Sequence, residues 1–131
     1  MNVVLTLPAR FPWDVWARHY RRVFARQVAL EWKLRAFPAS VRPGDRCYFV
    51  HRGEVKGWLG VAGLALALEP GADPKDAERL LLLEGPFRPM PPFPMRGFRG
   101  FRYAPNDLDA LADAAVEIAP APVDARWGAA P

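Results

Sequence analysis

The 131-residue chain has very few of the side chains that carry covalent or metal chemistry. Cys47 is its only cysteine, which excludes an intramolecular disulfide and a thiolate metal cluster. The two histidines, His19 and His51, lie far apart and lack metal-ligand spacing, so we expect no metal site. Thr6, Ser40 and Cys47 are the only small hydroxyl or thiol residues, and none lies in a nucleophile-elbow or cysteine-protease context.

Long apolar runs are missing as well. No apolar run reaches the roughly 20 residues that a membrane-spanning helix needs. The start, "MNVVLTLPAR", has neither a basic leader nor a long apolar region, which argues against a signal peptide. The stretch "GWLGVAG" lacks the lysine and the strand-to-helix setting of a nucleotide-binding glycine loop. We therefore expect a cytoplasmic protein with no membrane partner and no cofactor.

Charge is present, and it is unevenly distributed. The chain has 18 basic and 14 acidic residues, and 15 of the basic ones are arginine. Residues 1–60 carry 11 basic and 4 acidic groups, whereas residues 104–131 carry 1 and 5. Such a division favours an anionic partner, since the planar guanidinium suits phosphates and base edges. A coding bias toward arginine, alanine and proline would give the same composition, and the scarcity of Asn, Gln and Ser is typical of thermophiles.

The hydrophobic pattern predicts several short strands. "NVVLTLP" is a first strand that ends at Pro8, and residues 28–35 alternate between an apolar and a charged face. The apolar side consists of Val28, Leu30, Trp32 and Leu34; the charged side consists of Glu31, Lys33 and Arg35. "VRPGD" predicts a turn, residues 46–68 a hairpin around Arg52-Gly53, and "ERLLLLEGPF" a further strand. "RPMPPFPM" cannot be a central strand, because proline has no amide hydrogen, so we expect an extended segment lying over the barrel or a cleft.

Two segments have helical periodicity. Trp13, Trp16, Ala17, Tyr20, Val23 and Phe24 fall on one face of a helix whose arginines lie elsewhere. "APNDLDALADAAVEI" predicts a second helix, with Asn106 as N-cap. Residues 119–131 are expected to form a docked tail anchored by Trp127. Together the patterns predict one mainly β (α+β) domain spanning residues 1–131, a small barrel of five to six mixed strands with two flanking helices.

The segment "LEWKLRAFPASVRPGDRCYFVHRGEVKGWLGVAGL" resembles the core of the PUA-like superfamily, in particular ASCH and related small domains. That pattern has a strand with Glu-x-Arg, a turn ending in Pro-Gly-Asp, and a hairpin with a glycine-containing return strand. Glu31-Trp32-Lys33 and residues 42–45 occupy the first two positions here, and the resemblance covers roughly residues 28–103. The lysine and glycine of the full ASCH motif fall on Val28 and Arg26. The resemblance implies a PUA-like pseudo-β-barrel associated with RNA, modified bases or nucleotides; some relatives remove an acyl group from a modified cytidine.

The stretch "RGFRGFRY", residues 96–103, interleaves arginines with aromatic residues. It is not an RRM signature, because Arg99 stands where glycine or alanine belongs and Gly100 where an aromatic residue belongs. As a strand it would place Arg96, Phe98, Gly100 and Arg102 on one face and Gly97, Arg99, Phe101 and Tyr103 on the other. Aromatic rings stack on bases and arginines bind phosphates, which favours nucleic acid. The alternative is a barrel-closing strand whose aromatic rings belong to the core.

These observations predict that the domain binds RNA or a modified nucleotide in a basic, aromatic-lined cleft. The predicted binding residues are Glu31, Lys33, Arg35, Arg96, Phe98, Arg99, Arg102 and Tyr103. One alternative is a small amidohydrolase acting on an acylated nucleoside, which requires Thr6, Glu31 and Lys33 in one pocket. Another is a protein-interaction domain that uses "RPMPPFPM" or the Trp-rich helix, which requires large exposed apolar area there. The alternative to a functional role for Glu31, Lys33 and Arg35 is that they form cross-strand salt bridges on an exposed face. No catalytic residue is assigned, and the oligomeric state stays open.

Overall fold

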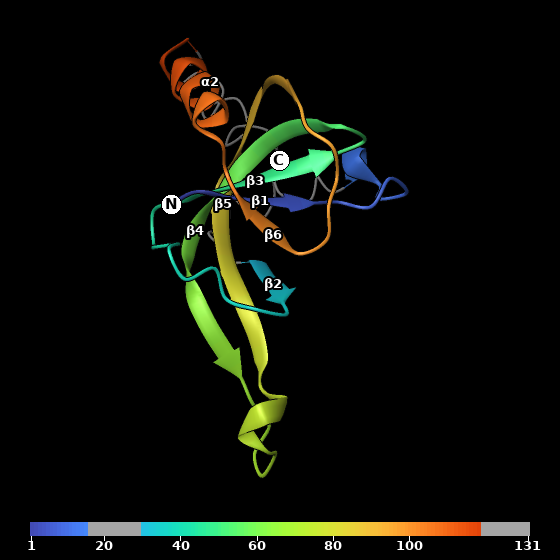
Figure 1. The fold of residues 1–131 in the computed structure, drawn as a ribbon, viewed down its shortest axis with the longest axis vertical. Helices are drawn as coiled ribbons and strands as arrows, with labels where there is room; N and C mark the ends of the chain where they lie inside the picture. Colours follow the sequence, from blue (N-terminus) through green and yellow to red (C-terminus); the bar gives the residue numbers. More distant parts are fainter. Residues whose placement is uncertain (16–29, 119–131) are drawn as a thin grey trace.

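The computed structural model describes residues 1–15 and 30–118. Its centre is a six-stranded sheet with the strand order β2-β5-β4-β3-β1-β6, which curls into a half-barrel (Figure 1). The strands are β1 Val3–Thr6, β2 Leu30–Leu34, β3 Arg46–His51, β4 Glu54–Ala67, β5 Glu78–Pro94 and β6 Phe101–Tyr103. The other elements are a 3₁₀ turn, η1 Pro74–Asp76, and the helix α2 Asn106–Ile118. This confirms the predicted mainly β, α+β fold class with a mixed sheet.

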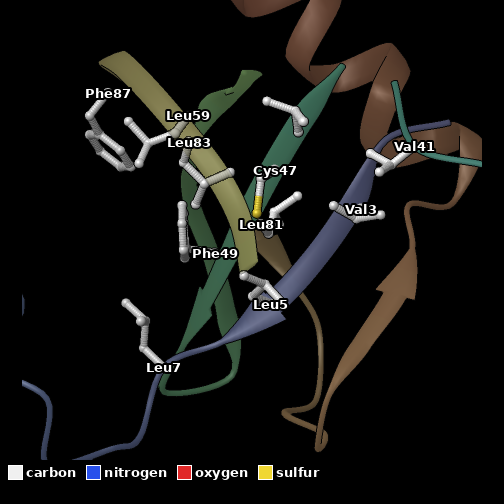
Figure 2. Close-up of a cluster of buried hydrophobic side chains, with 11 residues drawn as sticks. Val3, Leu5, Leu7, Val41, Cys47, Phe49, Leu59, Leu81, Leu83 and Phe87 are labelled. Atoms are coloured by element: carbon white, nitrogen blue, oxygen red, sulfur yellow. The ribbon is translucent and has the colours of Figure 1, made fainter. Parts of the chain in front are cut away.

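The sheet is mixed because β1 pairs with β3 in parallel, while every other neighbouring pair is antiparallel. Alternation along β1 separates two cores, since Val3 and Leu5 belong to a cluster inside the curl and Val4 to one on the opposite face. The inner cluster lies between β5 and β1 and includes Cys47, Phe49 and Leu81 (Figure 2). The helix α2 covers the outer cluster with Leu108 and Ala112.

The hairpin predicted around Arg52-Gly53 is confirmed. β3 and β4 are joined by these two residues, whose φ angles are +52° and +78°. Two positive φ angles define the tight turn whose twist matches that of the flanking strands. Arg52 tolerates this conformation, and its Nε donates a hydrogen bond to the Ala9 carbonyl at 3.1 Å.

The segment "RPMPPFPM" is not a central strand, as predicted, but it does not lie over the barrel or a cleft; up to Pro94 it is the end of strand β5 and pairs with β4. β5 continues to Pro94, and Pro89 lies opposite Gly57 and Phe93 opposite Val55 of β4. The prolines are tolerated because, among the described residues, β2 pairs with β5 only up to Leu83, so the later part of β5 has a described strand neighbour on one side only. A missing amide hydrogen matters only where a second neighbour needs it.

The helix α2 begins one residue earlier than the sequence predicts. α2 begins at Asn106 itself, and the carbonyl of Pro105 accepts hydrogen bonds from the amides of Leu108 and Asp109. Asn106 is therefore the first helical residue rather than the N-cap. The Asp109 carboxylate accepts instead from the Tyr48 hydroxyl at 2.7 Å and from Asn2 Nδ2 at 2.8 Å, which ties the helix to the sheet. Residues 13–15 are helical, as predicted.

The remainder of the predicted first helix, Val28 of the next strand, and the tail at residues 119–131 with Trp127 lie outside the described residues. Within the part of the chain that the structure describes, no helix has the length and apolarity to cross a membrane.

Cys47 should be chemically inert in the folded protein. Its side chain is fully buried in the inner core, and this burial raises the pKa of the thiol far above its usual range. Because the thiolate is the reactive form, we expect no alkylation by iodoacetamide under native conditions and one modified thiol per chain in denaturant, as measured by mass spectrometry. Native-state alkylation at the rate of a free small thiol would contradict the buried position.

Candidate ligand-binding groove

A groove of about 670 Å³ lies where the two sides of the half-barrel approach each other, between β2 and the loop that precedes β6. We call it the seam groove. Its lining residues are Leu5, Thr6, Trp32, Lys33, Leu34, Arg35, Ala36, Phe98, Arg99, Gly100 and Phe101. β2 and β6 are the two terminal strands of the sheet order, so the groove marks the open side of the half-barrel.

β2 forms one wall, and its alternation decides what it presents. Trp32 and Leu34 are partly buried against the inner core, whereas Lys33 and Arg35 are exposed, as the sequence predicts. The Trp32 ring is held by Phe49, with a centroid separation of 5.7 Å. The backbone carbonyl of Arg35 accepts a hydrogen bond from Arg79 Nη1 at 3.3 Å, which fixes the end of the strand without engaging the Arg35 guanidinium.

The loop of residues 95–100 forms the opposite wall, and it is anchored to β1. The Phe98 amide donates a hydrogen bond to Thr6 Oγ1 at 3.1 Å. A Cβ on Gly97 would lie only 2.9 Å from Thr6 Cγ2, so this close approach favours glycine. Gly100, with a φ of +72°, turns the chain into β6.

The prediction that residues 96–103 form one strand is therefore wrong for residues 96–100. Only Phe101–Tyr103 pair with β1, and the residues before them form the anchored loop. The physical reason is that the glycines permit a turn and a close backbone approach, both of which interrupt a ladder. The predicted division of residues 96–103 between the two faces of one strand is therefore wrong for residues 96–100.

The groove is basic and partly aromatic. Lys33, Arg35 and Arg99 contribute positive charge, and none of the described lining residues carries a carboxylate. Lys33 Nζ forms an ion pair with Glu78 Oε1 at 3.0 Å, but both side chains are exposed, so water screens the pair. Among residues 1–15 and 30–118, the structure assigns no ion pair to the guanidinium of Arg35 or Arg99. Three rings, Trp32, Phe98 and Phe101, supply flat apolar surface.

The structure brings together four of the predicted binding residues, Lys33, Arg35, Phe98 and Arg99. It does not place the other four, Glu31, Arg96, Arg102 and Tyr103, in the groove lining. Arg102 instead lies over the Phe98 ring, 4.5 Å from its centroid, and supports that ring from β6. The Tyr103 hydroxyl accepts a hydrogen bond from the Ser40 amide at 3.0 Å, and its ring packs edge-on against Phe101.

Trp32 and Phe101 are the aromatic groove residues that the sequence-based site prediction did not include. Trp32 lies on the apolar face of an alternating strand, which assigns it to the interior, and Phe101 is a core ring in the barrel-closing alternative; both pack partly against the inner core. The signal that distinguishes them is their place at the margins of the sheet, where a core side chain keeps one exposed face. A single sequence does not reveal which strands are terminal.

The three residues required for hydrolysis are not assembled. Thr6 and Lys33 line the groove, but Glu31 is exposed and does not. The Thr6 oxygen already accepts the Phe98 amide, and the Lys33 amine pairs with Glu78. The condition for the amidohydrolase alternative is thus unmet in the described residues.

The proline-rich segment also fails the condition set for an interaction surface. Met90, Phe93 and Met95 pack against the outer core, and no large hydrophobic residue of this segment is among the exposed ones. The Trp-rich helix beyond residue 15 lies outside the described residues. Exposed leucines occur elsewhere, at Leu64 and Leu66 in the last part of β4 and at Leu68 directly after it. We call residues 62–68 the β4 arm.

No protein-family model matches the chain, and no curated protein and no solved structure matches it. The PUA-like and ASCH resemblance therefore stays a prediction.

Proposed function

We propose that the chain binds RNA or a modified nucleotide in the seam groove. The observation that carries the proposal is the combination of three cationic side chains and three aromatic rings around one groove whose described lining residues include no carboxylate. Such a lining suits a ligand that is both flat and anionic, which is the chemistry of a nucleotide. The volume of about 670 Å³ falls in the range of small-ligand pockets.

The side chains divide into two roles. Phe98 and Trp32 stand on opposite walls and offer faces for base stacking, worth about 1–3 kcal/mol per base. Arg35 and Arg99 contact phosphate, and Lys33 adds positive charge at the rim. Arg102 acts through Phe98, because its guanidinium lies over that ring. A groove of this size accepts an unpaired base more readily than a duplex, so single-stranded RNA should bind better than double-stranded RNA.

Removing the two guanidinium groups tests the proposal. We expect Arg35→Ala/Arg99→Ala to weaken binding of labelled single-stranded RNA, measured by fluorescence anisotropy at three salt concentrations. Each phosphate contact contributes about 0.7 to the slope of log affinity against log salt for a single strand, so the double variant should lose about 1.4 of that slope.

The control is Arg10→Ala, which removes an exposed arginine that does not line the seam groove. It should leave both affinity and salt slope nearly unchanged. Competition by an unlabelled nucleoside monophosphate would localise recognition to a single nucleotide. Absence of binding to RNA and to nucleotides, or equal losses for the double variant and the control, would refute the proposed function.

A further inference from the structure

One side of the β4 arm has no strand neighbour among the described residues. β3 pairs with β4 only as far as Gly60, and the turn at residues 42–45 then accompanies Val61. The Val61 amide donates to the Asp45 carbonyl at 2.7 Å, and the Gly44 amide donates to the Val61 carbonyl at 2.8 Å. From residue 62 to Ala67, β4 pairs with β5 alone, and this part of the hairpin projects beyond the half-barrel (Figure 1).

Beyond the register irregularity between Val61 and Gly63, this free edge has no further protection against pairing with another chain. Natural edge strands are commonly guarded by lysine, proline or an inward-pointing charge. Residues 62–68, "AGLALAL", contain none of these. Leu64, Leu66 and Leu68 are 38%, 63% and 44% exposed, so three leucines in alternate positions give the edge an apolar face. An edge with free backbone groups and an apolar face is a pairing surface.

We propose that the occupant of this edge is a second copy of the chain, paired antiparallel with β4 across a two-fold axis at Ala65. Two identical antiparallel edges are self-complementary, so the sheets of both copies would join into one continuous sheet. Leu64 of each copy then lies opposite Leu66 of the other, on the same face. Residues 62–68 of each copy, which form the paired strip, are uncharged, so no like charges meet across the axis.

Charge and shape at the two ends of the strip favour a second copy over an unrelated partner. In this register Leu68 of one copy lies opposite residue 62 of the other, and intermolecular pairing stops there because the turn at residues 42–45 already occupies the edge at Val61. Glu69, the next residue of that copy, then lies beside Arg42, and the symmetry repeats the pair at the opposite end. Among the described residues, neither Arg42 nor Glu69 forms an ion pair within its own chain. An apolar hollow of about 220 Å³ adjoins Arg42 and lies next to the position of the second copy's Leu68; its other lining residues are Val41, Pro43, Val61, Gly63 and Leu64.

The oligomeric mass of the full chain tests the proposal. Light scattering across a dilution series should give twice the 14.7 kDa chain mass at high concentration. Leu66→Lys should shift the protein to one chain, and so should Arg42→Glu or Glu69→Arg alone, each of which creates like charges at both ends. The double variant Arg42→Glu/Glu69→Arg should restore the dimer, which a loss of folding would not. A monomeric wild type, or a dimer indifferent to all these changes, would overturn it.

Cross-linking tests the register independently. Ala65→Cys should form an intermolecular disulfide on oxidation, because the two Cβ atoms of a directly opposed pair are about 5 Å apart. Leu68→Cys is the matched control, since its two copies would be six residues apart along the strands, about 20 Å. The native Cys47 is buried and should not interfere. Cross-linking of the control but not of Ala65→Cys would exclude the two-fold axis at Ala65.

Discussion

Replacing Gly57 by alanine should lower the free energy of unfolding by about 3 kcal/mol, the upper part of the range for overpacking a core. Gly57 is buried in β4, where it lies opposite Pro89 of β5. A Cβ at this position would meet the Arg88 carbonyl oxygen at 2.4 Å and Phe87 Cζ at 2.5 Å. One obstacle is backbone and the other is a ring that is itself buried in the inner core, so neither moves easily.

The measurement is urea denaturation at one protein concentration, followed by tryptophan fluorescence. Gly60→Ala is the matched control in the same strand, because its Cβ would meet Glu84 atoms only at 3.5 Å or more, which is ordinary contact. That variant should change the free energy of unfolding by no more than about 0.5 kcal/mol. Equal stability of Gly57→Ala and the wild type would show that β4 and β5 are not packed as closely as described.

Truncating Phe49 should be the other severe change, with a loss of about 3–5 kcal/mol of stability for Phe49→Ala. The side chain is fully buried near the middle of β3, and it belongs to the inner core cluster. Its removal leaves a cavity beside Trp32, whose ring lies 5.7 Å from that of Phe49. Because Trp32 also lines the seam groove, ligand affinity should fall along with stability.

The conservative variant Phe49→Leu separates shape from hydrophobicity. It keeps most of the buried volume, so its expected cost is below about 1.5 kcal/mol. Thermal and urea unfolding of the two variants, with anisotropy of those that remain folded, provide the comparison. A Phe49→Ala protein as stable as the leucine variant would contradict the close packing of the inner core.

The strand assignments show which structural features a local sequence pattern can predict. The alternation of Leu30, Trp32 and Leu34 with Glu31 and Lys33 predicts one buried and one exposed face, and β2 has both. The turn residues Arg52 and Gly53 predict the hairpin that joins β3 to β4. These features depend on residues adjacent in the chain, and that is why periodicity and turn chemistry suffice to predict them.

The proline-rich segment and the glycine-arginine stretch show where the pattern fails. Whether prolines can occupy a strand depends on how many neighbours that strand has, and the described part of β2 pairs no further than Leu83, before the prolines begin. Whether residues 96–100 extend a strand depends on Thr6, which binds the Phe98 amide from a distant part of the chain. Neither fact is recorded in the local sequence.

The sequence by itself determined the mainly β fold class, the hairpin turn, the faces of β2 and the abundance of arginine. Only the tertiary structure decided which cations share a groove, since Arg35 and Arg99 meet through the curl of the sheet, and Arg96 stays outside despite an equivalent local context. It also decided that Trp32 lines that groove and that, among the described residues, the edge of β4 is open beyond Val61. Local periodicity specifies the face on which a side chain lies, but strand order and curvature arise from contacts between residues far apart in the chain.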